Sequence, residues 1–318
     1  MRVVIIGGTG HIGTYLTPRL VRAGHDVVVV SRGQRNPYHM QAEWDSVTRV
    51  TIDRAEAESR GEFGPRIRAL EPDTVIDLIC SQPESTAGLI EALRGQVEQF
   101  LHCGTIWVHG RSEVVPTRED HPRRPLEDYG RRKLAIERML MHEARTGGLP
   151  ATVLHSGHIV GPGWIPVTPA VNSDPEVFRA LATGKEVVLP NLGMETLHHV
   201  HADDLAQAFM CAITHWSSAV GESFHAVSEQ AVTLRGYAEA VASWFGREAH
   251  LRFEAWTQWR ESLSESEAAV AESYLQHSPN CSIEKARTLL DYRPRYSSLE
   301  AVRQSVEWLI AQGQLTVD

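Results

Sequence analysis

The strongest structural signal in this chain is the stretch Val3-Val4-Ile5-Ile6-Gly7-Gly8-Thr9-Gly10-His11-Ile12-Gly13. Its β-branched run predicts a buried strand, and the apolar residues at helical spacing in 11–23 predict a helix. The glycines between them fit both the G-x-G-x-x-G and the G-x-x-G-x-x-G pattern. Glycines at these positions permit a tight turn and close approach of a pyrophosphate to the helix N-terminus. The segment therefore predicts a dinucleotide-binding turn.

Further apolar runs extend this pattern along the chain. The runs at 27–30, 75–79 and 99–103 have the composition of strands that are covered on both faces, and helical patterns at 64–70 and 84–94 lie between them. Alternating strands and helices form a parallel sheet with right-handed crossovers. The expected fold class is therefore α/β, with a Rossmann-type doubly wound parallel sheet.

The second half of the chain predicts a smaller lobe. Proline and glycine become dense between Gly161 and Pro169, which indicates a loop that leaves the sheet. Helical patterns follow at 175–182, 202–213, 234–245, 265–274, 283–290 and 299–311. We expect a dinucleotide-binding domain at 1–165 that residues 200–227 rejoin, and a C-terminal substrate lobe formed by 166–199 and 228–318.

Composition narrows the class of protein. With 42% hydrophobic and 22% charged residues among 318, the chain can bury the core of an ordinary globular protein. Its net charge of −9 argues against nucleic acid or acidic membranes as partners and favours a small molecule. The four cysteines show no paired spacing, and the apolar N-terminus is too short for a signal peptide. These features predict a cytoplasmic protein.

The end of the second strand bears on which cofactor is bound. An NAD site usually carries an acidic residue there, which holds the ribose diol. This strand ends instead in Ser31-Arg32-Gly33. A hydroxyl and a guanidinium suit the 2′-phosphate of NADP, so NADP(H) is expected more than NAD(H), with Ser31 and Arg32 as contacts. The alternative is a solvated surface arginine.

Tyr129 and Lys133 have the Y-x-x-x-K spacing, which places both side chains on one face of a helix. A tyrosine ordinarily has a pKa near ~10, and a neighbouring ammonium favours the phenolate, so this pair predicts proton transfer to or from a substrate hydroxyl. Thr105 follows the strand at 99–103, at the sheet edge where doubly wound folds bind ligands. It is expected to hydrogen-bond the substrate oxygen, unless it is a turn threonine that caps its own backbone.

These motifs resemble the extended short-chain dehydrogenases, also called NAD-dependent epimerase/dehydratases. The segments Ser156-Gly157-His158-Ile159-Val160-Gly161-Pro162-Gly163 and His199-Val200-His201-Ala202-Asp203-Asp204-Leu205-Ala206 extend the resemblance over nearly the whole chain. The resemblance implies catalytic roles for Thr105, Tyr129 and Lys133, contact of Lys133 with the nicotinamide ribose, and a homodimer built on the helix that carries Tyr129. It implies cofactor contacts for Gly7, Gly10, His11, Ile12 and Gly13.

The chain departs from the pattern of that family at several positions. His109 replaces the tyrosine of a V-Y-G segment, Cys103-Gly104 replaces a serine pair, and His155 stands where an arginine is common. We expect His109, His155 and His158 near the nicotinamide end as substrate contacts, although plain packing is the alternative. Asp53 resembles the aspartate that contacts adenine in the family, although it also fits a solvated loop residue.

Histidines also raise the question of a metal. The chain has 16, including the cluster His198, His199 and His201. The sequence does not indicate the third ligand and the supporting shell that a metal site needs, so no metal is expected.

We therefore expect a hydride-transfer enzyme of the epimerase/dehydratase type that acts on a secondary alcohol or ketone, including sugar-like ones. One alternative is a net NADP(H)-dependent ketone reductase or alcohol dehydrogenase, and another is a non-catalytic, cofactor-sensing protein. Nucleotide-sugar enzymes of the family carry an arginine before the H-V-x-D-D segment, where this chain has Leu197 or Glu195. UDP- and GDP-sugars are therefore expected to bind poorly, unless the lobe supplies another cation from Arg179, Lys185 or Arg235.

Overall fold

The computed structural model describes residues 1–317, and its centre is a seven-stranded parallel sheet. The strands are β1 (Arg2–Ile6), β2 (Asp26–Ser31), β3 (Thr48–Thr51), β4 (Thr74–Asp77), β5 (Gln99–Thr105), β6 (Ala151–Ser156) and β11 (Ser223–Ala226). They lie in the order β11-β6-β5-β4-β1-β2-β3, so the strand order reverses between β1 and β4. This arrangement confirms the predicted Rossmann-type fold.

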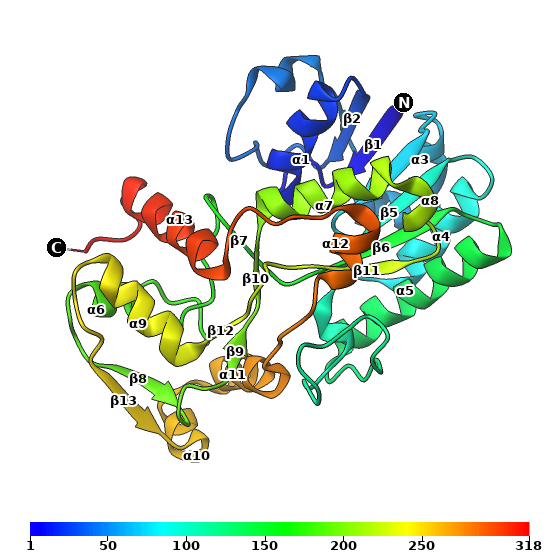
Figure 1. Cartoon of the computed structure of the whole chain (residues 1–318). Coiled ribbons are helices and arrows are strands. Elements are labelled where there is room, and N and C mark those ends of the chain that lie inside the picture. The colour runs from blue at the N-terminus through cyan, green and yellow to red at the C-terminus, as the bar shows by residue number, and fades with distance from the viewer. Residues whose placement is uncertain (318) are drawn as a thin grey trace.

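Helices cover both faces of the sheet (Figure 1). On one face lie α1 (His11–Arg22), α7 (Ala202–Thr214), α8 (Trp216–Ala219) and α12 (Glu284–Leu290), and on the other lie α2 (Arg54–Ser59), α3 (Phe63–Arg68), α4 (Pro83–Leu93) and α5 (Asp128–Thr146). Each face buries its own apolar cluster, one around Leu16 and Phe209 and the other around Leu89 and Leu140. Because both faces are covered, β4, β5 and β6 are buried along their whole length.

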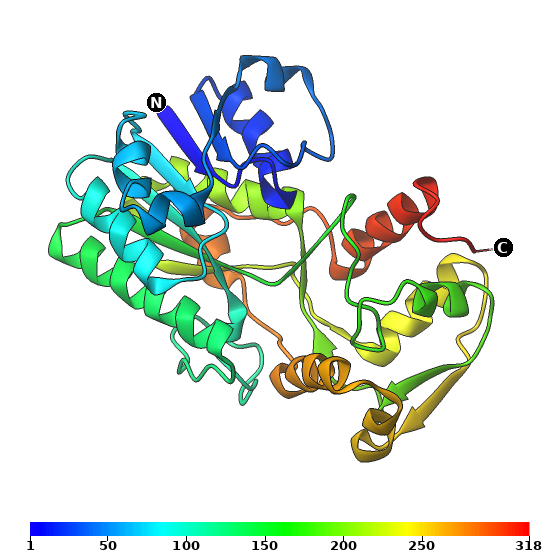
Figure 2. The same cartoon turned by 180° about the vertical axis from the view of Figure 1, so that it is seen from behind.

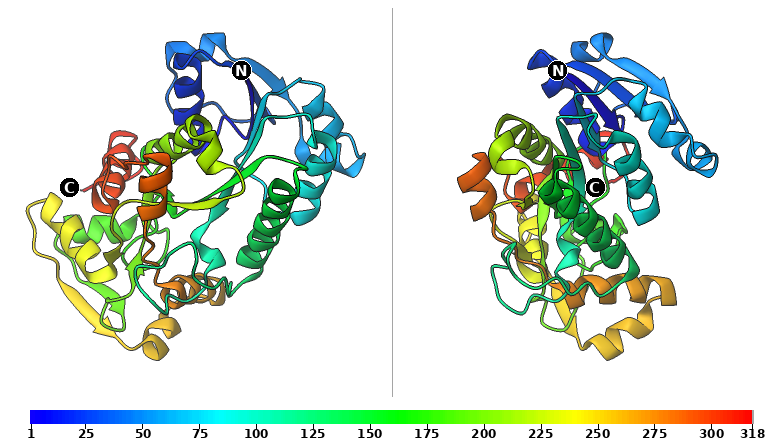
Figure 3. Two further views of the ribbon diagram at one scale, coloured as in Figure 1. Left: turned by 45° about the vertical axis from the view of Figure 1, so that its right-hand side comes forward. Right: turned by 90° about the vertical axis from the view of Figure 1, so that its right-hand side faces the viewer.

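The remaining elements form a second body beside the carboxyl edge of the sheet (Figures 1 and 2). They are β7 (His158–Val160), α6 (Glu176–Ala182), β8 (Val187–Pro190), β9 (Thr196–Leu197), β10 (His199–His201), β12 (Val232–Thr233), α9 (Leu234–Trp244), β13 (Leu251–Glu254), α10 (Trp256–Trp259), α11 (Glu265–His277) and α13 (Ser298–Ala311). Three short strand pairs, β7 with β10, β8 with β13 and β9 with β12, tie it together around a third apolar cluster that includes Phe178, Tyr237 and Leu309. Both views of Figure 3 separate this yellow-to-orange region from the blue N-terminal strands.

Two segments depart from the expected lobe boundaries. The strand pair formed by β7 and β10 belongs to the second body, although residues 1–165 and 200–227 were expected in the dinucleotide-binding domain. The region of α12 departs in the opposite sense, because all of 228–318 was expected in the second body. Ile283, Leu290 and Tyr292 are buried in the apolar cluster of the sheet, because the apolar side of α12 packs on α7, α8 and β11. The helical spacing of this segment predicts an apolar face, but it does not predict which layer that face covers. Among residues 1–317, no helix has both the length and the apolar character that crossing a bilayer requires.

Candidate active site

The glycine turn between β1 and α1 has the geometry that the sequence predicts. Gly7 has a φ of 86°, in the left-handed region that favours glycine, and its N–H donates to the carbonyl oxygen of Val30 at 2.9 Å. Gly13 lies so close to the turn that a Cβ would be 2.1 Å from the carbonyl oxygen of Gly8. The turn therefore brings the N-terminus of α1 to the carboxyl edge of the sheet, where an anion fits.

Two cavities meet at this turn. One of about 550 Å³ and one of about 450 Å³ share Gly7 and Gly10 as lining residues, and the first is also lined by His11 and Ile12. The larger of the two extends toward β5 and α5, and the smaller extends toward the ends of β2 and β3. The pair has the shape and the backbone donors that a dinucleotide needs, with its pyrophosphate at the turn.

The smaller cavity contains the residues expected at the adenosine end. Ser31, Arg32 and Asp53 line it together. Arg32 is exposed, and the Ser31 hydroxyl accepts a hydrogen bond from the N–H of Gly33 at 3.2 Å. Asp53 caps α2, where its carboxylate accepts the N–H of Glu56 at 3.1 Å. The structure thus brings these three residues to one wall.

A buried ion pair that the sequence analysis missed supports this wall. Arg54, which lines the smaller cavity, donates to both carboxylate oxygens of Asp77 at 2.9 and 3.0 Å, and Asp77 is fully buried. The available signal was an aspartate at the end of an apolar strand, because a buried carboxylate requires a charged or hydrogen-bonding partner.

Thr105 and Tyr129 face the larger cavity together. Thr105 ends β5, and Tyr129 lies in the first turn of α5. Burial raises the pKa of Tyr129 to about 12, while a hydrogen bond with the Thr105 side chain opposes this increase. The phenol therefore carries its proton at neutral pH. The arrangement can deliver that proton to an oxygen in the cavity.

Lys133 is directed differently from the sequence expectation. Its Nζ donates to the carbonyl oxygens of Cys80 and Cys103, each at 2.6 Å, and lies 3.5 Å from Nε2 of His102. The ammonium is 5.9 Å from the ring centroid of Tyr129, and burial lowers the pKa of Lys133. This lysine joins the end of β5 to the loop after β4, so its contact with the ribose stays a prediction.

The three histidines expected at the substrate are not together. His158 lines the larger cavity, where its Nε2 accepts the N–H of Val167 at 3.3 Å. His155 is completely buried, and its Nδ1 accepts the N–H of Thr105 at 3.1 Å. His109 is buried against His225, with 2.8 Å between their Nε2 atoms. His109 and His155 are not among the residues that line the larger cavity, so their contact with a substrate stays a prediction.

Aromatic side chains that the sequence analysis did not single out form much of that wall. Tyr38, Trp107, Trp164 and Tyr274 line the larger cavity. Trp164 stacks on His11 with ring centroids 5.3 Å apart and an interplanar angle of 11°. From the sequence, the segment that contains Trp164 is predicted only to be a loop. A tryptophan between the glycines and prolines of a surface loop was the available signal.

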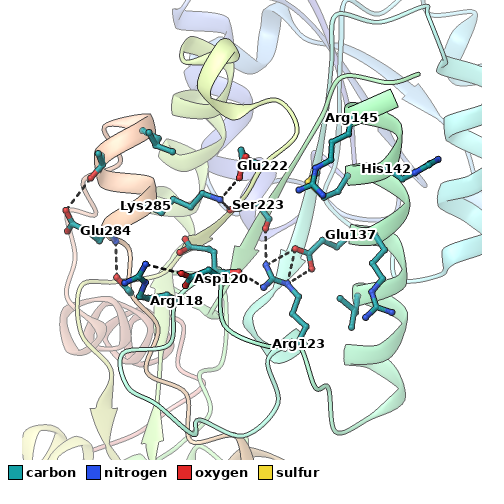
Figure 4. A pocket seen from close by; sticks show the side chains of 17 residues that line it. Arg118, Asp120, Arg123, Glu137, His142, Arg145, Glu222, Ser223, Glu284 and Lys285 are labelled. Carbon is teal, nitrogen blue, oxygen red and sulfur yellow. Dashed lines mark hydrogen bonds and ion pairs between the residues drawn. The ribbon is translucent and has the colours of Figure 1, made fainter. Parts of the chain in front are cut away.

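A third cavity, of about 1110 Å³, lies between α5, α12 and the segment 118–123 (Figure 4). Charged side chains such as Arg118, Arg123, Glu137 and Lys285 line it. Despite its size, we place the candidate active site at the glycine turn, because Thr105 and Tyr129 line the cavity there.

Two of the three clustered histidines have ordinary protein partners, whereas the ring nitrogens of His199 are buried without a hydrogen bond in the described part of the chain. His198 donates from Nε2 to the carbonyl oxygen of Ser228 at 2.9 Å, and its Nδ1 accepts the N–H of Cys281 at 3.0 Å. His201 accepts the N–H of Asp203 at 3.0 Å. Within residues 1–317, no group of three or more histidine, cysteine or acidic side chains is arranged to hold a metal ion.

Sequence comparison gives a family match over most of the chain. Residues 3–226 match the NAD dependent epimerase/dehydratase family. The chain is 25% identical to the chloroplast stem-loop binding protein of 41 kDa b of Arabidopsis thaliana, over 98% of this chain and 80% of that protein. It is 28% identical to 2′-dehydrokanamycin reductase of Streptomyces kanamyceticus, over 78% and 67%. It is 26% identical to UDP-glucose 4-epimerase of Azospirillum brasilense, over 67% and 68%.

Solved structures show the same fold. UDP-glucuronic acid 4-epimerase from Bacillus cereus, in complex with NAD, superposes with a TM-score of 0.74 at 17% identity, over 98% of this chain and 99% of that one. Pal from Bacillus thuringiensis superposes with a TM-score of 0.76 at 18% identity, over 98% and 100%.

Proposed function

This chain belongs to the NAD-dependent epimerase/dehydratase family and is an NAD(P)-dependent enzyme of the extended short-chain dehydrogenase type, and we propose that it interconverts a small ketone and its secondary alcohol. Tyr129 is the proton donor and acceptor. The observation that carries this proposal is the shared cavity, in which Thr105 and Tyr129 lie beside the glycine turn. We further propose NADP(H) as the cofactor, held at its 2′-phosphate by Arg32.

The proposed chemistry needs two groups from the chain. The cofactor supplies or accepts the hydride at the carbinol carbon. The Tyr129 hydroxyl, protonated at neutral pH, gives its proton to the ketone oxygen during reduction. In the reverse direction the Tyr129 phenolate takes the proton from the alcohol. The Thr105 hydroxyl hydrogen-bonds the same oxygen and keeps it within reach of the phenol.

Replacement of Tyr129 by phenylalanine tests this role. Tyr129→Phe removes only the hydroxyl, so we expect turnover of ketones with NADPH to fall roughly a hundredfold or more, while cofactor affinity measured by calorimetry stays within about twofold. Tyr296→Phe is the control, because Tyr296 is not among the residues that line the two cavities at the glycine turn and should keep near-normal turnover. Near-normal rates in Tyr129→Phe would show that the proposed mechanism is wrong. Cofactor binding by the unaltered protein without turnover of any ketone or alcohol would favour the cofactor-sensing alternative.

The proposed substrate is small and carries little charge. Leu197 is buried in the core of the second body, and Glu195 accepts a hydrogen bond from Asn191. Arg179 pairs with Glu176, and Arg235 pairs with Glu239. In the described part of the chain, Arg179, Lys185 and Arg235 are not among the side chains lining the larger cavity, whereas Arg35 is. A diphosphate there would meet the Arg35 guanidinium and lack its other charge-assisted partners.

Ligand-observed NMR tests this substrate class. A lost charge-assisted bond costs roughly 1.5 to 3 kcal/mol, so we expect UDP and UDP-glucose to show no micromolar binding in saturation-transfer experiments. The cofactor serves as the positive control in the same sample. Micromolar binding of UDP-glucose that Arg35→Ala, Arg179→Ala, Lys185→Ala or Arg235→Ala abolishes would restore a nucleotide-sugar substrate.

The same cavity favours release of the product over return of the hydride to the opposite face. An epimerase must hold its ketone intermediate while the ring turns, and a tightly held anionic group is a suitable anchor for that motion. A small substrate in this cavity lacks such an anchor. We therefore favour net reduction or oxidation, in which one cofactor molecule is oxidised or reduced for each product molecule formed. The ratio of cofactor converted to product formed can be measured, and it should be one.

A further inference from the structure

Gly104 and His155 are in direct contact across two neighbouring strands. In the register of β5 and β6, Gly104 is paired with His155, and Thr105 is paired with Ser156. A Cβ at position 104 would lie 2.5 Å from Nδ1 of His155 and 2.8 Å from Cγ1 of Val153. Heavy atoms do not approach this closely, so the imidazole occupies the space that a side chain at position 104 would need.

This position lets the imidazole reach the backbone of Thr105. Its Nδ1 accepts the Thr105 N–H at 3.1 Å, in a site where the histidine is completely buried. Because Nδ1 acts as the acceptor, Nε2 carries the proton of the neutral ring. That nitrogen lies 3.1 Å from Oε1 of Glu137. The ring is thus hydrogen-bonded at Nδ1, while Nε2 is in close contact with the Glu137 carboxylate without a well-aligned hydrogen bond.

Glu137 is itself held in place. Arg123 donates to its carboxylate from Nε and Nη2 at 2.9 to 3.1 Å, and also donates to the Ser223 hydroxyl at 3.1 Å (Figure 4). Burial alone would raise the pKa of Glu137, but its contacts with the His155 imidazole and the Arg123 guanidinium outweigh burial and lower the pKa. The carboxylate is therefore ionised, and an ionised partner strengthens its contact with the imidazole.

This network connects the two elements that carry the proposed chemistry. Glu137 lies on α5 two turns after Tyr129, and His155 holds the backbone of Thr105 at the end of β5. Resting on the proposed function, we propose that His155 is a positioning residue that sets the Thr105 hydroxyl relative to Tyr129, and that Gly104 is glycine in order to admit its ring. The two departures from the family pattern, at 104 and 155, are then one structural device.

Two substitutions of His155 separate positioning from mere filling of space. His155→Asn can place an amide oxygen near the position of Nδ1 and accept the Thr105 N–H, but it is too short to reach Glu137. His155→Gln places its amide near the position of Nε2 and can keep the contact with Glu137, but it gives up Thr105. We expect kcat to fall roughly tenfold or more in His155→Gln and to stay within about threefold in His155→Asn, with little change in KM.

Gly104→Ala provides an independent test of the contact. We expect Gly104→Ala to lower kcat about as much as His155→Gln does. The double variant, which combines Gly104→Ala with His155→Gln, should be no slower than the slower single variant, because both changes remove the same hydrogen bond to the Thr105 N–H. Gly88→Ala is the matched control, since a Cβ at position 88 meets open space. Additive losses in the double variant would overturn the proposal.

Hydrogen exchange of the Thr105 amide, followed by NMR, needs no substrate and completes the test. We expect protection of this amide to be retained in His155→Asn and to fall roughly tenfold in His155→Gln. Should His155→Gln fail to fold, Glu137→Gln, which leaves the imidazole in place, is expected to reduce the protection as well. Unchanged protection in the folded variants would overturn the proposal. Reduced protection of the Thr105 amide in His155→Gln, together with normal turnover in Tyr129→Phe, would give a different result. It would support the role of His155 in holding the Thr105 backbone and would reject the proposed function.

Discussion

Thr105 and Tyr129 line one cavity because the carboxyl ends of parallel strands meet at one edge of the sheet. The partner of the buried His155, however, depends on how β6 is aligned with β5, and no sequence motif specifies this register. The same holds for Lys133, whose ammonium turns to two backbone carbonyls. Spacing along a helix places a side chain on a face without fixing its partner.

Arg32 is the residue on which cofactor selection is expected to depend. It is exposed and lines the smaller cavity with Ser31. Because a guanidinium binds the 2′-phosphate with charge-assisted hydrogen bonds, Arg32→Ala should weaken NADPH binding about tenfold and change NADH binding little. Calorimetric titration of both cofactors measures the difference, and Arg66→Ala, an exposed arginine outside the cavity, is the control. Equal affinities of the unaltered protein for NADPH and NADH would contradict the assignment.

Single elements were more predictable than their assembly. The glycine turn, α1 and the buried strands follow from periodicity and from residues with special backbone freedom. The sequence did not predict the short strand pairs β8 with β13 and β9 with β12, because strands of two to four residues show little hydrophobic periodicity. The placement of α12 on the sheet also escaped, since an apolar face fits any apolar layer of suitable shape.

The contact between α1 and the glycine turn gives a prediction at this scale. Gly13→Ala would put a Cβ 2.1 Å from the carbonyl oxygen of Gly8, so the helix must move away from the turn. We expect a loss of roughly 2 kcal/mol in the free energy of unfolding, together with weaker cofactor binding. Gly88→Ala in α4 meets open space and should be neutral or stabilising by about 0.5 to 1 kcal/mol. Urea denaturation of both variants measures these changes in the free energy of unfolding. Equal stabilities of Gly13→Ala and Gly88→Ala would mean that the close approach of Gly13 to Gly8 does not matter.

The molecule as a whole consists of a sheet domain and a second body whose cores are separate clusters. Loop composition indicates where the chain first leaves the sheet, near Gly161, and the family resemblance indicates where it returns. The remaining boundaries of the two parts, and the expected homodimer, stay predictions. Burial of many polar residues was not evident from composition either, because a count of 16 histidines does not reveal how many are inside.

Those buried histidines make the stability of the whole molecule depend on pH. Chiefly through burial, the pKa falls to about 3 for His11 and His109 and to about 4 for His198 and His201, from 6.5 in the unfolded chain. The unfolded state therefore binds more protons below pH 6.5, so the stabilisation is present above that value and is lost as the pH falls toward 4. Each histidine contributes about 2 kcal/mol less to the free energy of unfolding at pH 5 than at pH 6.5, and four such losses approach the 5 to 15 kcal/mol typical of a whole domain.

Urea denaturation followed by tryptophan fluorescence tests this dependence and should show a much lower free energy of unfolding at pH 5 than at pH 7. His198→Gln should reduce this dependence by about one proton, whereas substitution of the exposed His142 by glutamine should leave it unchanged. Equal stability of the unaltered protein at the two pH values would show that these imidazoles accept protons without unfolding.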